Sequence, residues 1–166
     1  MITLEQYTQS VCHEMSVIRH LYGKVPVSAR NLRLAPNGRS TLELLRYLSV
    51  CGIGPAKALV KSDWNLAREV IAASATLEWD DIPAALNTQE RELKALLSTL
   101  KTSDLSNNTV YPWGETTTLG PALVNTVLKF LTAYRMELFW HAKAGGAQIT
   151  TPNCWRGTDA AMPAKS

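Results

Sequence analysis

Histidine, the side chain most often used for metal binding and acid–base catalysis near neutral pH, is scarce in this sequence. Its 166 residues include three histidines, namely His13, His20 and His141. A histidine-rich metal centre would have to use nearly all of them, because each imidazole supplies one metal bond. Glu137 and His141 lie four residues apart on one face of an expected helix. A divalent-metal site of His20, Glu137 and His141 is therefore chemically possible. The alternative is that both histidines serve near helix C-termini, where a partial positive charge is favoured.

The cysteines do not define a reactive site. They are odd in number and widely spaced, which argues against a disulfide scaffold and a cysteine-only zinc site: Cys12, Cys51 and Cys154. A nucleophilic Cys154 would need a neighbouring base and a lowered pKa, and the sequence identifies neither. The chain also lacks a Gly-x-Ser-x-Gly elbow, and Gly52 and Gly54 lack the third glycine of a phosphate-binding loop. No standard catalytic motif is present.

Long amphipathic helices are the elements expected to position these side chains. Apolar residues recur every three or four positions in residues 3–22, 80–100 and 119–144. At 1.5 Å per residue, the last of these helices would be about 40 Å long. No alternating pattern typical of strands competes with them. We therefore expect an all-α four-helix bundle with a long crossover and a short extra helix.

Shorter elements are expected in the middle of the chain. Ser40 and Glu43 have the spacing of a capping box, which predicts a helix start. Gly52 to Pro55 should interrupt that helix, and Asp63 should cap another short one. Residues 103–114 are expected to form a loop with an aromatic core, Tyr-Pro-Trp-Gly.

Composition indicates a single globular domain. Apolar residues make up 46% of the chain and charged residues 19%. We expect residues 1–157 to form the domain and residues 158–166 to be a flexible tail. The sequence has no recognisable signal peptide and no run of about 18 apolar residues, so we expect a cytoplasmic protein without membrane contact.

The charge is unevenly distributed. The formal net charge is only +3, which does not by itself imply nucleic-acid binding, and we expect none. Between Arg19 and Lys61, however, eight basic residues face one acid, Glu43. This excess is either a solvated basic face or an anion-attracting surface near the first long loop.

The order of the segments resembles the DinB-like superfamily of helical bundles from Thr3 to about Gly157. The segments are GRSTLELLRYLS, LVNTVLKFLTAYRMELFWHAKAGG and the tail NCWRG. In DinB-like proteins the last helix commonly reads His-x-x-x-His-Arg-x-Gln-Leu and is followed by glycine. The run Arg135–Leu138 and the stop at Gly145 match that frame.

The resemblance implies a metal site that this sequence lacks. DinB-like enzymes hold a divalent metal with one histidine from the second helix and two from the last. Their activities are thiol-dependent transfer or isomerisation and, in some cases, hydrolysis. The frame places these ligands at Tyr47, Phe130 and Tyr134. Phenylalanine cannot bind a metal, and neutral tyrosine, with a pKa near 10, is a poor ligand.

Two functional interpretations follow. The first is a small-molecule-binding or interaction bundle without a cofactor, whose rings fill the core or line a residual pocket made by Tyr47, Trp113, Tyr134 and Trp155. The second is a thiol transferase or hydrolase that holds zinc, nickel or manganese at the replaced ligands His20, Glu137 and His141. In either case we expect a homodimer, because some of the five tryptophans should be exposed.

Overall fold

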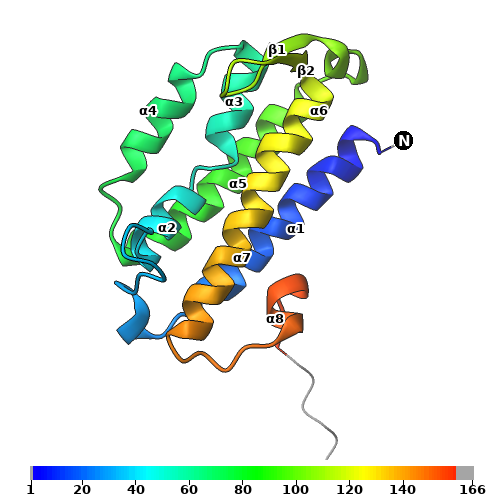
Figure 1. The fold of residues 1–166 in the computed structure, drawn as a ribbon. Coiled ribbons are helices and arrows are strands. Elements are labelled where there is room, and N and C mark those ends of the chain that lie inside the picture. Colours follow the sequence, from blue (N-terminus) through cyan, green and yellow to red (C-terminus); the bar gives the residue numbers. More distant parts are fainter. Residues whose placement is uncertain (1, 160–166) are drawn as a thin grey trace, which may run out of the picture.

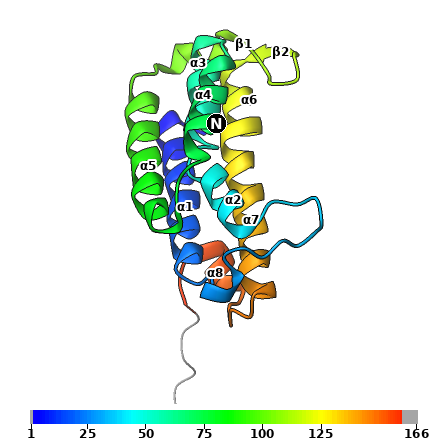
Figure 2. The same ribbon diagram turned by 90° about the vertical axis from the view of Figure 1, so that its left-hand side faces the viewer.

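The chain folds as an all-α bundle in which long helices lie side by side (Figures 1 and 2). The computed structural model describes residues 2–159. The expected tail, residues 158–166, falls outside this range from residue 160 onward. The helices are α1 (Leu4–Tyr22), α2 (Thr41–Leu48), α3 (Ile53–Lys61), α4 (Asn65–Ser74), α5 (Ile82–Ser98), α6 (Leu119–Leu123), α7 (Lys129–Ala144) and α8 (Thr151–Arg156). Within residues 2–159, each helix is too short or too polar to cross a lipid bilayer.

The expected apolar faces form the core. In α1 the buried stripe includes Met15, Ile18 and Leu21, which have no exposed surface. This face packs against α5 and α7. Helix α5 begins just after a 3₁₀ turn, η2 (Trp79–Asp81), with Pro83 in its first turn, as the sequence predicts.

The predicted capping box starts α2. The Ser40 hydroxyl accepts the Glu43 amide at 3.2 Å, and the Glu43 carboxylate accepts the Ser40 amide at 2.7 Å. The predicted interruption is also present, because the helix stops at Leu48 and restarts as α3. Together, α2 and α3 make one broken column of the bundle (Figure 1).

The last long helix is interrupted, which the sequence analysis did not foresee. A π-helical turn, η4 (Val124–Leu128), joins α6 to α7. A π turn shifts the regular pattern of backbone hydrogen bonds and leaves backbone carbonyls available to other donors. Here the Thr126 hydroxyl donates to the Ala122 carbonyl at 2.7 Å, and the Tyr7 hydroxyl of α1 donates to the Leu123 carbonyl at 2.9 Å. These two side chains compensate for the irregular turn.

A small hairpin replaces most of the expected loop. Strands β1 (Asn108–Val110) and β2 (Thr116–Thr118) pair antiparallel, after a 3₁₀ turn, η3 (Thr102–Ser106). With three residues each, the strands are too short to produce a recognisable alternating pattern. Gly114 has a φ of +96° in the connecting turn, a conformation that glycine adopts without strain.

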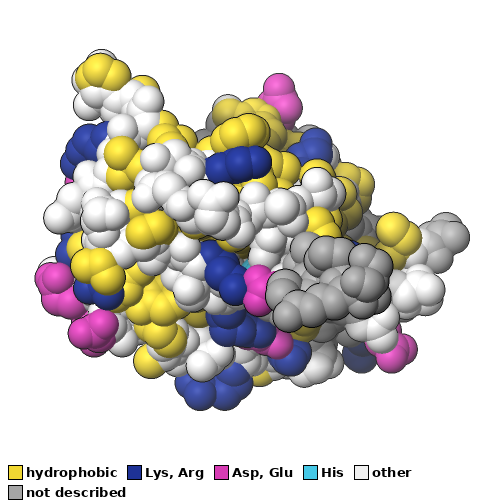
Figure 3. Space-filling view, turned by 90° about the horizontal axis from the view of Figure 1, so that it is seen from below, with side chains coloured by type: hydrophobic (Ala, Val, Ile, Leu, Met, Phe, Trp, Pro, Cys, Tyr) yellow, Lys and Arg dark blue, Asp and Glu magenta, His cyan; other side chains and the backbone are white. Residues whose placement is uncertain are grey.

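The opposite end of the bundle contains the turn η1 (Val27–Ala29), the loop that follows it, the end of α7, and α8. Figure 3 views the molecule from this end, where several Lys and Arg side chains gather near the middle of the face. The loop from residue 30 to residue 39 contributes three arginines, Arg30, Arg33 and Arg39. The basic excess expected from the sequence thus lies partly on this connection into α2.

Candidate functional site

Three aromatic side chains meet between α2 and α7. Tyr47 is near the end of α2, and Phe130 and Tyr134 are one turn apart on α7. The ring centroids of Tyr47 and Tyr134 are 4.8 Å apart in an edge-to-face arrangement, and those of Phe130 and Tyr134 are 6.4 Å apart. The three positions to which the sequence resemblance assigns metal ligands are therefore neighbours in space, and rings occupy all of them.

Arg39 places a positive charge on this aromatic cluster. Its guanidinium carbon lies 4.4 Å from the Tyr47 ring centroid and 5.1 Å from that of Tyr134. Both distances suit a cation–π interaction. Burial raises the pKa of Tyr47, so its hydroxyl stays neutral at physiological pH. The cluster consequently presents a fixed cation and a neutral phenol, a combination that disfavours a metal ion.

An open cleft adjoins the cluster, between α2, α3, α4, α7 and the hairpin turn. Its volume is about 340 Å³, within the range of roughly 300–1,000 Å³ typical of ligand pockets. Arg68 is its one charged lining residue, and the lining is otherwise apolar and aromatic. We call this the aromatic cleft, lined by Tyr47, Pro55, Trp64, Ala67, Arg68, Ile71, Pro112 and Phe130.

The structure brings together only part of the expected pocket. Tyr47 lines the aromatic cleft. Tyr134 lies behind this lining, where its ring packs against those of Tyr47 and Phe130. Trp113 instead stacks on Tyr111 with centroids 4.5 Å apart, and it is 56% exposed. Trp155 lies on α8, where its ring is 4.7 Å from the guanidinium carbon of Arg135.

Trp64 is the tryptophan that lines the aromatic cleft. Its indole N–H donates to the Val110 carbonyl at 2.8 Å, which ties the start of α4 to the hairpin. The sequence predicts a short helix after Asp63, but it gives no sign that Trp64 or Arg39 belongs to a site. Trp64 falls in the apolar pattern of that short helix, which predicts packing rather than a site, and Arg39 lies in the irregular loop before Ser40, where no pattern predicts its contacts.

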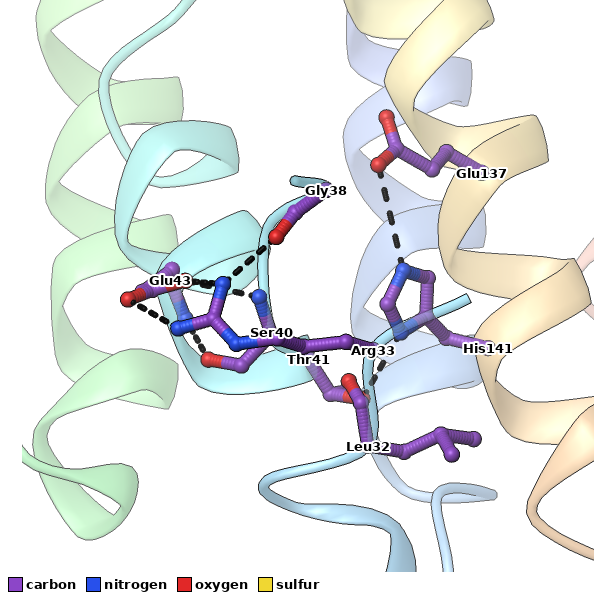
Figure 4. Close-up of polar contacts among 8 residues, drawn as sticks. All are labelled: Leu32, Arg33, Gly38, Ser40, Thr41, Glu43, Glu137 and His141. Atoms are coloured by element: carbon purple, nitrogen blue, oxygen red, sulfur yellow. Dashed lines mark hydrogen bonds and ion pairs between the residues drawn. The ribbon is translucent and has the colours of Figure 1, made fainter. Parts of the chain in front are cut away.

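Of the three alternative metal ligands, Glu137 and His141 are neighbours in the structure, whereas His20 has other partners. The His141 Nδ1 atom lies 2.9 Å from the Thr41 hydroxyl, and its Nε2 atom lies 3.8 Å from a Glu137 oxygen (Figure 4). His20 instead contacts Asn153 at 3.1 Å. Among residues 2–159, no group of three or more His, Cys, Asp or Glu side chains is arranged to hold a metal ion.

His141 is not a surface cap at a helix end. It is 1% exposed, and burial lowers its pKa although the nearby Glu137 carboxylate opposes this effect. The ring contacts Thr41 and the Leu32 carbonyl on the loop that leads into α2 (Figure 4). His141 therefore anchors that loop to α7 as a neutral side chain.

A second polar contact holds the same loop. Arg33 forms an ion pair with Glu43 at 2.8 Å and donates to the Gly38 carbonyl (Figure 4). The hydrogen bond from Arg33 is the main reason that the pKa of Glu43 falls to about 2. Since Arg39 directly follows Gly38, these contacts help to fix its position over the two tyrosines.

We expect the protein to lose stability as the pH falls below 6.5. A histidine with a pKa lowered by folding binds more protons when unfolded, so stability is present above pH 6.5 and is lost as the pH falls. Each unit of lowering is worth about 1.4 kcal/mol. Denaturant unfolding at pH 7.5, 6.5 and 5.5 measures the effect.

A His141→Asn variant should show a weaker pH dependence than the parent, although it is less stable at pH 7.5. The pKa of His20 is also lowered, by burial and by Lys24, so His20→Asn should remove another part of the dependence. The exposed His13 gives the matched control, His13→Asn. If His141→Asn keeps the full pH dependence, the assignment to His141 is wrong.

Comparison with known proteins defines the class of fold. No protein-family model matches the sequence, and no curated protein sequence matches it. A DinB-like protein from Bacillus subtilis, YjoA, has a similar structure, with a TM-score of 0.69, 14% identity, and 87% of this chain and 94% of that chain covered.

A mycothiol-dependent maleylpyruvate isomerase is also similar, with a TM-score of 0.60 and 15% identity. The match covers 89% of this chain and 62% of the isomerase. An alanine variant of the isomerase gives a TM-score of 0.55 at 16% identity, with the same coverage. At these identities the likeness concerns the fold. The chain is thus an all-α helical bundle, and its fold is the DinB-like one expected from the sequence.

Proposed function

We propose that this chain is a DinB-like bundle that binds a small organic molecule in the aromatic cleft and has no three-histidine metal centre. The observation that carries the proposal is the occupation of the three expected ligand positions by Tyr47, Phe130 and Tyr134, next to a cleft of about 340 Å³. Aromatic and apolar walls bind flat organic groups by burying surface and by ring contacts.

The charge at the cluster supports the same proposal. Arg39 lies over Tyr47 and Tyr134, so a divalent cation placed between these rings would be repelled by the guanidinium. A neutral phenol offers little to offset that repulsion. An organic molecule avoids this conflict because it needs contact surface rather than metal-ligating atoms.

Thermal melting tests the proposal in two arms. Addition of zinc, nickel or manganese should leave the melting temperature unchanged, whereas a small set of aromatic compounds should contain members that raise it. A ligand at a hundred times its Kd stabilises by about 2.7 kcal/mol, a rise on the order of 5–10 °C. Stoichiometric metal in tag-free protein, lost in His141→Ala, would support the metal-dependent transferase or hydrolase instead.

A cleft-filling variant gives the matched control. Ile71 lines the aromatic cleft from α4, and its neighbour Ala72 is exposed on the same helix. The Ile71→Trp variant should fold and lose the stabilisation by aromatic compounds, while Ala72→Trp should keep it. Equal stabilisation of both variants would place binding elsewhere and contradict the proposal.

Two broader features belong to the same proposal. We propose that the protein works as a homodimer in the cytoplasm. Exposed tryptophan surface supports the dimer, since Trp113, Trp140 and Trp155 are each more than half exposed. Sedimentation velocity across micromolar concentrations measures the oligomeric state.

A further inference from the structure

The charges around the aromatic cleft have one sign. Arg68 is the charged residue in its lining, and Arg39 lies against Tyr47, which forms part of the same wall. Among the residues that the structure describes, 2–159, no acidic side chain lines the aromatic cleft. Other arginines nearby are neutralised, since Arg33 pairs with Glu43 and Arg46 with Glu78. The cleft therefore has an uncompensated positive environment.

The Arg39 side chain has unused hydrogen-bonding capacity. Within residues 2–159, it makes no ion pair and no hydrogen bond, and its guanidinium lies over the two tyrosine rings. A guanidinium has five N–H donors in a planar fork, and contact between its face and a ring leaves those edge donors available. Such a fork matches the two oxygens of a carboxylate.

The same geometry argues against an organic cation. The π faces that would attract a cation, those of Tyr47 and Tyr134, already contact Arg39. A cationic ligand would have to displace this guanidinium or stack on the other lining rings, Trp64 and Phe130, and in either place it would be near Arg68 with no acidic side chain among the described lining residues to neutralise it. An anionic ligand gains from both arginines and leaves the cation–π contacts in place.

We infer that the aromatic cleft takes a flat, apolar organic carboxylate whose carboxylate group is bound by Arg39. The apolar body lies in the cleft against Trp64 and Phe130, the two large rings of the lining besides Tyr47. Arg68 adds a second, more exposed positive charge that attracts the same ligands. This inference rests on the proposed function, because it names the ligand class for that cleft.

Three probes with one ring system test the inference: 2-naphthoate, 2-naphthamide and (2-naphthylmethyl)trimethylammonium. Isothermal titration at low and moderate salt gives each Kd. We expect the naphthoate to bind at least tenfold more tightly than the amide and the cation, with an affinity that falls as salt rises. In Arg39→Gln the naphthoate should bind no better than the amide.

Two further variants separate charge from structure. Arg91 is exposed on α5, so Arg91→Gln removes the same charge at a distance and should leave all three affinities unchanged. Arg39→Lys keeps the charge without the planar fork and should retain part of the preference for naphthoate. Melting temperatures of all variants close to that of the parent show that the bundle remains folded.

The outcomes distinguish failure of the carboxylate inference from failure of the proposed function. If the amide or the cation binds as tightly as the naphthoate, or if Arg39→Gln weakens all three probes equally, the carboxylate inference is overturned while the cleft remains a binding site. If no probe binds to the parent protein, and the titrations of the parent and of Ile71→Trp are the same, the proposed function fails. The carboxylate inference then fails as well.

Discussion

Replacing Gln89 by leucine should destabilise the bundle by about 3–5 kcal/mol, because this one side chain joins the two halves of the broken α2–α3 column. Gln89 lies on α5 and is 2% exposed. Its amide oxygen accepts the backbone N–H groups of Gly52 and Ile53 at 2.8 and 3.2 Å. Its amide nitrogen donates to the Leu48 carbonyl at 2.8 Å. Leucine fills the space but leaves the two N–H groups without the Gln89 acceptor, and it leaves the Leu48 carbonyl with only the long contact from the Cys51 thiol, at 3.9 Å.

Unfolding in denaturant, followed by circular dichroism, measures this loss. Gln89→Glu keeps acceptors for both N–H groups and loses the donor to Leu48, so its stability should fall between those of the parent and the leucine variant. Asn87→Ala changes an exposed amide on the same helix and should alter stability by less than about 0.5 kcal/mol. A loss below 1 kcal/mol in Gln89→Leu would mean that the break is held by other contacts.

The break between α2 and α3 also shows how far the sequence can be interpreted. Gly52 to Pro55 predicts an interruption, and the Ser40–Glu43 spacing predicts the helix start, because both are local effects within a few residues. Gln89, whose side chain binds the backbone at this break, is 37 residues away from Gly52 in the sequence. Its position follows from the packing of α5 on α3, which no local pattern encodes.

The residues at the aromatic cleft likewise include some that the sequence predicts and some that it does not. The resemblance at Arg135–Leu138 set the helical frame, and that frame brought Tyr47, Phe130 and Tyr134 together as it implied. Arg39 belongs to an irregular loop whose path depends on His141 and Arg33, so its contact with the rings could not be inferred from spacing. Trp113 was a reasonable choice by composition, but the hairpin directs it onto Tyr111.

Irregular backbone accounts for the other differences. The π turn at η4 adds only one residue to a helical turn, so the spacing of the apolar residues changes little. The sequence therefore predicts a single long helix there. Helix α8 has only six residues, too few for a periodic pattern to reveal it. Its place in the structure depends on Arg135, a buried residue in the middle of α7.

Replacing Arg135 by methionine should release α8 and cost about 3 kcal/mol, because it leaves a largely buried carboxylate unpaired. Arg135 is 1% exposed, and its Nε atom lies 2.5 Å from an oxygen of Glu14 on α1. The guanidinium also donates to the Cys154 carbonyl and lies over the Trp155 ring. One side chain thus connects α1, α7 and α8.

Two measurements separate release of α8 from a general loss of stability. Cys154 is 2% exposed, so in a Cys12→Ser background its reaction with a thiol reagent should be slow in the parent and much faster in Arg135→Met under native conditions. The fluorescence of Trp155 should change together with this reactivity. Arg156→Met alters an exposed arginine on α8 itself and should affect neither measurement.

Glu14→Gln completes a double-mutant cycle with Arg135→Met. The glutamine still accepts a hydrogen bond, but it leaves the guanidinium of Arg135, which is 1% exposed, without a counter-charge, so this variant should also lose stability, by an amount comparable to that of Arg135→Met. In the double variant no buried charge is left unpaired, and the total loss should be less than the sum of the single losses. Strict additivity would show that Glu14 and Arg135 act independently, and α8 would then be held by its apolar contacts rather than by this ion pair.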